Sequence, residues 1–211
     1  MTRKSVNPAT QLAISQLASC KLVPSRHNIL TDLPKGGVIA EVGVAFGDFS
    51  RAILDIAKPR EFFALDLFNL ETYSTAFGIN IAQKFGGLSH LEYFENRFRE
   101  EITAGTVKIR KGFSAELLAT FPPEFFDAIY IDAAHDYENV KRDLEAAVCA
   151  IKFTGTIIMN DFTMSSPFDG QLYGVVQATT EFCAANGWEF SHFALHPLMY
   201  CDVAIRRPSS C

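Results

Sequence analysis

Residues 38–50 read VIAEVGVAFGDFS, and they carry the strongest structural signal in the chain. An apolar run with a single acid comes first, two glycines four residues apart follow, and the chain then continues as a helix would. Short apolar runs are typical of buried parallel strands. A glycine turn between such a strand and a helix directs backbone amides at a polar ligand group. The segment therefore predicts a strand, a ligand-binding turn and a helix of an α/β protein.

The turn does not match two common phosphate-binding patterns. A P-loop requires Lys and then Ser or Thr after its second glycine, whereas Gly47 is followed by Asp48 and Phe49. A dinucleotide fingerprint that starts at Gly43 would place Ala45 and Asp48 where glycines belong. An acid at that position repels the pyrophosphate that the turn should hold. The turn thus disfavours NAD as the ligand.

Two acids near the turn favour a cationic ligand with free ribose hydroxyls. Glu41 lies near the end of the first strand, where its carboxylate can face an amino or sulfonium group. Asp66 closes the run FFALD of the second strand and can accept hydrogen bonds from both ribose hydroxyls. The alternative is that both acids only cap neighbouring helices. Ligands of doubly wound sheets bind at the carboxyl ends of the strands, which favours the first interpretation.

Beyond the turn, apolar runs alternate with amphipathic segments, as in a mostly parallel sheet covered by helices on both faces. We expect parallel strands at 38–42, 61–65, 106–110, 127–131 and 156–160, and an antiparallel hairpin of 188–195 and 200–205. We expect helices at 48–57, 71–83, 90–104, 114–120, 137–151 (with Gly155 as its stop) and 172–186. The prediction is an α/β, Rossmann-like three-layer sandwich with a seven-stranded sheet and an antiparallel C-terminal hairpin. One domain, 1–211, includes residues 1–37 as a helical lead-in that Pro8 helps to open.

The run EVGVAFGDFS resembles the first motif of class I S-adenosylmethionine-dependent methyltransferases, which is an acid, any residue, Gly, three residues and Gly. The resemblance covers the chain from about residue 38, and the predicted hairpin is similar to the end of that family's seven-stranded sheet. It implies S-adenosyl-L-methionine as the cofactor. The cofactor-binding residues that it implies in the first two strands and the turn are Glu41, Gly43, Ala45, Gly47, Ser50 and Asp66.

The segment KGFSAELL, residues 111–118, is similar to the part of the family that borders the adenine. The resemblance implies that Phe113 offers an aromatic face to the cofactor and that Ser114 offers a hydrogen bond. Two other interpretations stay open, since Ser114 could only cap the helix that follows and Phe113 could pack in the core.

Polar side chains follow the fourth and fifth parallel strands. Asp132 and His135 come after the fourth strand, and Asn160 and Asp161 come after the fifth. Adjacent strands lie about 4.8 Å apart, so these four side chains can converge. A histidine can take the proton of a hydroxyl nucleophile, and a carboxylate-bound Mg²⁺ can instead lower the pKa of that hydroxyl. The predicted catalytic residues are His135 and Asp132.

This block resembles a branch of small O-methyltransferases that act on sugars and other natural-product hydroxyls. The resemblance implies Mg²⁺ held by Asp132 and Asp161, with Asn160 as a third ligand. Two departures weaken the metal hypothesis: Asn160 precedes Asp161, in the order opposite to that of catechol-type enzymes, and Ala134 stands where many relatives carry an acid. For His135 a structural role, bonded to a neighbouring carboxylate, stays open.

Three other features are interpreted from their position in the chain. Asp136 is expected to cap the helix that follows it. The loop 162–171 contains Ser, Pro and Gly and suits a substrate lid, with ordinary surface variation as the alternative. Arg26 and His27 could reach over the cofactor from the lead-in. No role is assigned to the two histidines near the closing hairpin, His192 and His196.

Composition limits the classes of partner. The net charge of -5 and the lack of a basic block argue against a nucleic-acid surface. No apolar run approaches the roughly 20 residues that span a membrane, and no apolar segment follows the basic residues at the start, so we expect no secretory signal. The five cysteines are widely spaced without a CxxC pair, which indicates reduced thiols in a cytoplasmic protein. The expected partner is a small molecule with a hydroxyl, and a homodimer is left open.

Three functional hypotheses follow. The first is a methyltransferase that moves the methyl of S-adenosylmethionine to a hydroxyl of a small molecule. The second is a non-catalytic binding protein with a degenerate cofactor pocket, which would bind the cofactor without any methyl transfer. The third is an NAD-linked oxidoreductase, although the chain lacks the glycine fingerprint and a Tyr-xxx-Lys pair.

Overall fold

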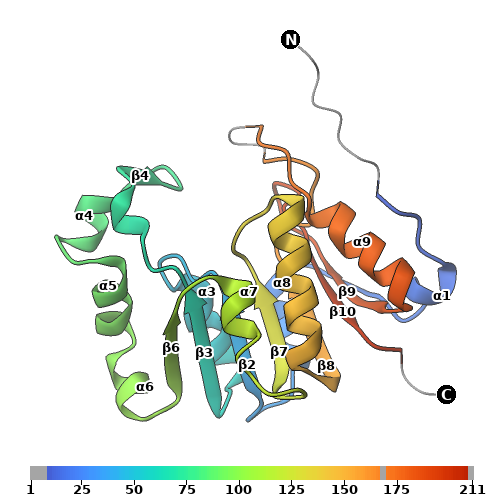
Figure 1. The fold of residues 1–211 in the computed structure, drawn as a ribbon, viewed down its shortest axis with the longest axis horizontal. Helices are drawn as coiled ribbons and strands as arrows, with labels where there is room; N and C mark the ends of the chain where they lie inside the picture. Colours follow the sequence, from blue (N-terminus) through green and yellow to red (C-terminus); the bar gives the residue numbers. More distant parts are fainter. Residues whose placement is uncertain (1–8, 167–169, 209–211) are drawn as a thin grey trace.

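The main sheet has eight strands in the order β1-β9-β10-β8-β7-β2-β3-β6 (Figure 1), in a computed structural model that describes residues 9–166 and 170–208. Strand β10 runs antiparallel to both of its neighbours, and the other neighbouring pairs are parallel. This confirms the predicted Rossmann-like α/β fold and its C-terminal hairpin. The strands are β1 (Lys21–Val23), β2 (Val38–Val42), β3 (Glu61–Asp66), β6 (Val107–Lys111), β7 (Phe126–Ile131), β8 (Ile151–Met159), β9 (Glu189–Ala194) and β10 (Asp202–Arg206).

The predicted count of seven strands is one too few. Strand β1 lies in the segment that we expected to be a helical lead-in, and it pairs parallel with β9 at the edge of the sheet. It has three residues, two of them exposed, so it shows neither an apolar run nor an alternating pattern. The lead-in therefore contains a strand between two short helices, α1 (Ile14–Leu17) and α2 (Arg26–Asp32). The expected helix start at Pro8 lies outside the described residues.

Helices cover both faces of the sheet, with α8 and α9 on one face and α2 and α3 on the other (Figure 1). Successive residues of β2 enter different cores: Ala40 packs with Val140 of α8, and Ile39 packs with Phe49 of α3. Among the described residues, no helix is long and apolar enough to cross a membrane. The remaining helices are α3 (Asp48–Ala52) with the π-helix η1 (Ile53–Ala57), α4 (Ile81–Phe85), α5 (His90–Arg97), α6 (Arg99–Thr103), α7 (Ser114–Leu118), α8 (Tyr137–Ala150) and α9 (Val175–Asn186).

The helix stop predicted at Gly155 is wrong. Helix α8 ends at Ala150, and strand β8 begins directly at Ile151. The pairing of β8 with β7 shifts register in this part of the strand, and a β-carbon at Gly155 would lie 2.6 Å from the Ile151 side chain. Gly155 is therefore required by a strand irregularity, where glycine permits close approach of side chain and backbone.

The predicted helix at 71–83 is also wrong. A short 3-10 turn, η2 (Leu70–Thr72), leads into a two-stranded hairpin of β4 (Thr75–Ala76) and β5 (Ile79–Asn80), and only α4 is helical. The two residues at the hairpin tip, Phe77 and Gly78, have φ of +53° and +73°. Positive φ at both central residues is what a type I′ turn requires, and this local chemistry overrides the weak helical pattern. The hairpin presents Phe77 at its tip.

The segment expected as one helix at 90–104 is broken at Phe98, whose φ of -113° separates α5 from α6. Phe94 and Phe98 are both fully buried. The ring of Phe98 lies directly beneath the glycine turn, because a β-carbon at Gly47 would be 2.6 Å from it. The break in the helix therefore lets the Phe98 ring support the ligand-binding turn.

Candidate active site

The first position of the turn requires glycine, because the ends of two strands pack closely there. Gly43 has φ of +83°, and a β-carbon there would lie 2.1 Å from the carbonyl oxygen of Asp132. No other residue type combines that conformation with that contact. Gly47 also has positive φ, and Ala45 adopts φ of +43° between the two glycines. The turn that follows β2 thus lies against the chain that leaves β7.

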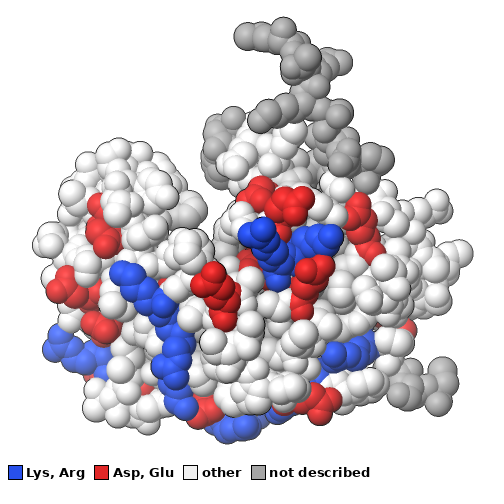
Figure 2. Space-filling view, viewed as in Figure 1, with Lys and Arg blue, Asp and Glu red and all other residues white. Residues whose placement is uncertain are grey.

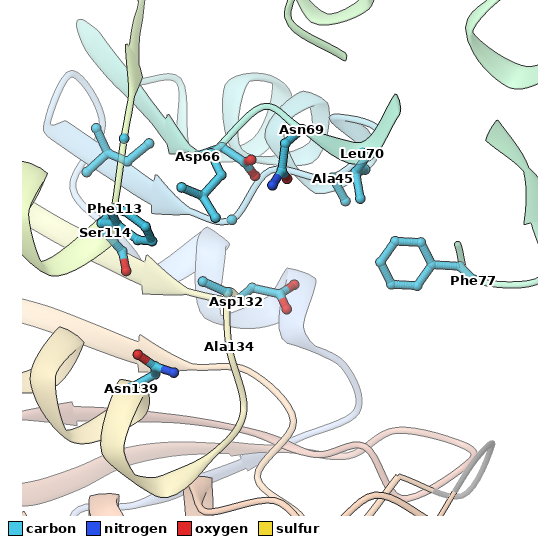
Figure 3. A pocket seen from close by; sticks show the side chains of 15 residues that line it. Ala45, Asp66, Asn69, Leu70, Phe77, Phe113, Ser114, Asp132, Ala134 and Asn139 are labelled. Atoms are coloured by element: carbon cyan, nitrogen blue, oxygen red, sulfur yellow. The ribbon is translucent and has the colours of Figure 1, made fainter. Parts of the chain in front are cut away.

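A cavity of about 310 Å³ opens where the carboxyl ends of β2, β3, β6 and β7 meet. This is the smaller of two cavities at the sheet edge, and Figure 3 shows Phe113 and Ser114 at one end of it and Phe77 at the other. Figure 2 shows the surface hollowed between the lobe that carries the hairpin and the rest of the molecule. The predicted cofactor-binding residues that line the cavity are Gly43, Ala45, Asp66, Phe113 and Ser114.

Asp66 is held in place by the backbone on both sides. Its Oδ2 accepts a hydrogen bond from the amide of Val44 at 2.8 Å, and its Oδ1 accepts one from the amide of Phe68 at 2.6 Å. Each carboxylate oxygen has a second lone-pair direction, so the carboxylate can still accept from a ligand. Two backbone bonds fix its orientation before any ligand arrives.

Phe113 and Ser114 lie at the start of α7. Phe113 is 64% exposed and borders the cavity, so it does not have the core position that was left open from the sequence. Ser114 is the first helical residue, and its hydroxyl donates a hydrogen bond of 2.5 Å to Asp143 of α8. The hydroxyl therefore makes a contact between helices, and the helix-capping alternative is not what the structure shows.

Glu41 is fully buried and accepts a hydrogen bond from the hydroxyl of Ser50. Burial raises the pKa of Glu41 to about 8, an effect that the Ser50 hydrogen bond only partly opposes. Glu41 lines a second cavity, whereas Ser50 and Gly47 line neither of the two. Ser50 is thus placed to hold Glu41, and Gly47 is placed over Phe98.

The second cavity is larger, about 650 Å³, and adjoins the first. Both cavities are lined by Gly43, Ala45, Phe77, Asp132 and Ala133, so they share the glycine turn and the hairpin tip. Carboxylates dominate the polar lining of the larger cavity, with one arginine and two histidines beside them. These charged and titratable residues are Glu41, Asp48, Asp132, Asp161, Asp202, Arg26, His135 and His196.

His135 lies between two carboxylates of the larger cavity. Its Nε2 is 3.7 Å from Oδ1 of Asp132 and 3.5 Å from Oδ2 of Asp161. These distances are too long for good hydrogen bonds, and the buried Nε2 has no hydrogen-bond partner within the described residues. The imidazole stacks on the ring of Tyr173 with centroids 4.5 Å apart. Burial raises the pKa of both carboxyls. The structure therefore brings three of the four predicted polar residues together.

Asn160 belongs to a different group, centred on a buried tyrosine. The Tyr130 hydroxyl donates to Asp202 at 2.7 Å and accepts from Asn160 and from Arg26, each at 2.9 Å. The Asn160 amide also donates to Asp202 at 3.3 Å. Burial raises the pKa of Asp202 to about 6. Arg26 lies 4.0 Å from Asp132, so this network supports the floor of the larger cavity.

The predicted Mg²⁺ set does not fit this arrangement. The His135 ring lies between the carboxylates of Asp132 and Asp161, and the Asn160 amide nitrogen donates into the separate group of Tyr130 and Asp202. Within residues 9–166 and 170–208, no three His, Cys, Asp or Glu side chains are grouped so that they could hold a metal ion. The described residues therefore give the metal hypothesis no support.

Several residues of the larger cavity were not predicted from the sequence. Asp202 and Tyr130 are buried polar residues in otherwise apolar strands, which is a detectable signal because buried acids are rare without a partner. His196, to which no role was assigned, lines the cavity from the loop between β9 and β10. Phe77 escaped notice because its hairpin was interpreted as a helix.

Only some residues of the lead-in and of the region around the expected lid line the larger cavity. Arg26, the first residue of α2, lines the larger cavity, with its guanidinium 4.4 Å from the Phe49 ring centroid. His27 lies on neither cavity. Within the predicted lid, residues 167–169 lie outside the described part of the chain. Tyr173, which follows that loop, lines the larger cavity.

Comparisons with solved structures agree with this fold. A Corynebacterium glutamicum protein aligns with a TM-score of 0.61 and 13% identity, over 88% of this chain and 79% of that chain. A SAM-dependent methyltransferase from Aquifex aeolicus aligns with a TM-score of 0.57 and 11% identity, over 86% and 89%. Aeropyrum pernix fibrillarin with natively bound S-adenosyl-L-methionine aligns with 0.52 and 16%, over 85% and 72%. At these identities the likeness establishes the fold.

A comparison with curated protein sequences gives no match. A family model described as a methyltransferase domain matches residues 40–162, which is more than half of the chain. That match begins within β2, contains the glycine turn and Asp66, and ends just after Asp161. The resemblance to class I S-adenosylmethionine-dependent methyltransferases is thus confirmed, and this protein belongs to the methyltransferase domain family.

Proposed function

We propose that this protein transfers the methyl group of S-adenosylmethionine to a hydroxyl of a small molecule, with His135 as the general base. The proposal rests on His135, which lines the larger cavity and whose buried Nε2 has no hydrogen-bond partner in the described residues. A nitrogen of this kind is free to accept a proton from a bound hydroxyl. The carboxylates of Asp132 and Asp161, on either side, would stabilise the imidazolium that results.

The two cavities supply matching parts of a cofactor site. Asp66, already oriented by two backbone amides, would accept the ribose hydroxyls in the smaller cavity, and Phe113 would cover the base. Glu41 makes no salt bridge with any residue that the structure describes, and its carboxylate is buried beside the larger cavity. A cationic amino or sulfonium group next to Glu41 would stabilise its ionised form. These features fit a cofactor with a ribose and a positive centre.

Bound S-adenosylmethionine supplies a methyl group whose bond to sulfur breaks as the bond to the acceptor oxygen forms. His135 takes the hydroxyl proton at Nε2 during that transfer, because a neutral hydroxyl is a weak nucleophile. Phe77, which borders both cavities from the hairpin tip, would help to exclude water from the space where they join. The acceptor hydroxyl would occupy the larger cavity, close to Asp132.

Two measurements test the proposal in sequence. Isothermal calorimetry with S-adenosylhomocysteine is expected to show binding, and the absence of binding at millimolar concentration would rule out the cofactor site. Transfer of a labelled methyl group is then measured across a panel of small hydroxyl compounds, with Mg²⁺ and with a chelator. Binding without transfer to any acceptor would favour the non-catalytic hypothesis. Transfer that disappears with the chelator would restore the metal hypothesis.

A further inference from the structure

A buried acid stands directly behind the end of the smaller cavity. Oδ1 of Asp143, on α8, accepts a hydrogen bond of 2.5 Å from the hydroxyl of Ser114. Ser114 itself lines the cavity, next to Phe113 (Figure 3). Asn139, one turn earlier on the same helix, lines that cavity as well. The face of α8 that carries Asp143 is therefore the face turned toward the cofactor site.

Asp143 is poorly accounted for as a purely structural residue. It is 2% exposed, and its second oxygen, Oδ2, has no hydrogen-bond partner within the described residues. It forms no salt bridge with any described side chain, so its one hydrogen bond from Ser114 is all that compensates its burial. A carboxylate buried in this way is costly, and an apolar residue would pack there at lower cost. Such local costs are expected mainly at functional positions.

The Asp143–Ser114 bond decides what the serine can offer to a ligand. A serine hydroxyl has one proton and two lone pairs. Its proton is directed to Asp143, so the hydroxyl oxygen of Ser114, a residue that lines the cavity, offers only lone pairs to a ligand. Burial raises the pKa of Asp143 to about 6, and the group is therefore ionised, and an acceptor, at pH 8. A ligand atom opposite Ser114 must then be a hydrogen-bond donor.

We propose that Asp143 is a positioning residue that sets the base specificity of the cofactor site, by making Ser114 an obligate acceptor for the exocyclic amine of adenine. This inference rests on the proposed function, since it requires the nucleoside part of the cofactor to lie in the smaller cavity. A 6-oxo purine presents an oxygen in place of the amine, and two acceptors would then face each other. The site should reject such a base, because a buried acceptor left unpaired is more costly than a missing attraction.

The test compares S-adenosylhomocysteine with S-inosylhomocysteine, its 6-oxo analogue, by calorimetry at pH 8. The wild-type protein is expected to bind the adenine compound at least about tenfold more tightly, the range for one hydrogen bond exchanged for a repulsive contact. In Asp143→Asn the amide can donate to Ser114 and free its proton for the ligand. The preference for adenine should then fall by about fivefold or more, while the fold, followed by circular dichroism, is retained.

Two further variants separate positioning from general damage. Ser114→Ala should also reduce the preference, and adding Asp143→Asn to it should change the preference no further, since Asp143 acts through Ser114. Asp127→Asn is the matched control, because Asp127 is a partly buried acid that bonds the Val38 amide and Lys152 and borders neither cavity. Its preference should equal that of the wild type.

The outcomes distinguish this inference from the proposed function. If S-adenosylhomocysteine does not bind to the wild-type protein, the cofactor site itself is wrong. If it binds, and either the two compounds bind equally or Asp143→Asn keeps the full preference, the role of Asp143 is refuted while the cofactor site stands.

Discussion

The two cavities differ in where their walls come from. All residues that line the smaller cavity lie between Gly43 and Asn139, inside the segment 40–162 that matches the methyltransferase family model. The larger cavity also takes Arg26 from before that segment, and Tyr173, His196, Leu198, Tyr200 and Asp202 from after it. The smaller cavity lies wholly within the matched segment, and the larger one is completed by residues on either side of it. We expect changes in the smaller cavity to affect the cofactor, and changes in the part of the larger cavity around His135 to affect the acceptor.

The largest effect is expected from His135→Ala, which should lower the rate of methyl transfer and leave cofactor binding almost unchanged. Loss of the general base should lower kcat for methyl transfer by about 10²–10⁴. The affinity for S-adenosylhomocysteine should stay within about threefold, because His135 lines only the larger cavity. His27→Ala serves as the matched control, since His27 lies on neither cavity. Equal losses of kcat and of cofactor affinity in His135→Ala would show that the cavities do not act separately.

Asp66→Ala should disable the smaller cavity. It removes the expected ribose acceptor and leaves the amides of Val44 and Phe68 without their partner. Calorimetry should show affinity for S-adenosylhomocysteine weakened by about 10- to 100-fold, with a loss of about 1–3 kcal/mol in the free energy of unfolding. Asp55→Ala, at an exposed acid in η1, should change neither quantity. An unchanged affinity in Asp66→Ala would remove Asp66 from the cofactor site.

Glu41→Gln tests the electrostatic character of the larger cavity. Burial raises the pKa of Glu41 to about 8, so the folded state binds a proton more tightly than the unfolded state does. The stabilisation that this proton gives is present at acidic pH and is lost as the pH rises through about 8. Urea unfolding from pH 5 to 8 should show wild-type stability falling relative to Glu41→Gln, by on the order of a few kcal/mol. Parallel pH curves would contradict the raised pKa.

The smallest effect is expected from Phe77→Ala, at the point where the cavities meet. Phe77 is 75% exposed, so the free energy of unfolding should change by less than about 0.5 kcal/mol. It borders both cavities, and its loss should weaken cofactor binding and raise KM for the acceptor by about three- to tenfold each. Tyr73→Ala, at another exposed aromatic near the hairpin, is the control. A change in only one of the two quantities would assign Phe77 to one cavity.

Sequence alone predicted the parts of the fold that are governed by local pattern. The run Val38–Val42 is buried on both faces, and its apolar composition reveals this directly. The turn and Asp66 are adjacent to strand ends, so their place at the sheet edge follows from the strand assignments. Asp136 was predicted correctly as a helix cap, and its side chain accepts from the amide of Asn139.

The errors have two physical causes. Strand β1 and the hairpin tip at Phe77 are too short for periodicity to register, and their structure depends on pairing partners or on two positive φ values. The larger cavity depends on contacts between segments far apart in the chain, such as the bond of Arg26 to Tyr130 across 104 positions. No local pattern encodes such a contact, so the bond of Arg26 was not predicted and Asp202 was missed.

The contact between Gly43 and the Asp132 carbonyl also limits how this protein can be re-engineered. A β-carbon at position 43 would lie 2.1 Å from that oxygen, so the wall that both cavities share consists of bare backbone at Gly43. A residue with a side chain at position 43 fits this wall only if β2 and β7 move apart. New methyl acceptors are therefore best sought by exchanging the segments around Arg26 and around residues 196–202. These segments line the larger cavity and leave the wall at Gly43 unchanged. Gly43 must be kept, whereas the segments that complete the larger cavity can be exchanged.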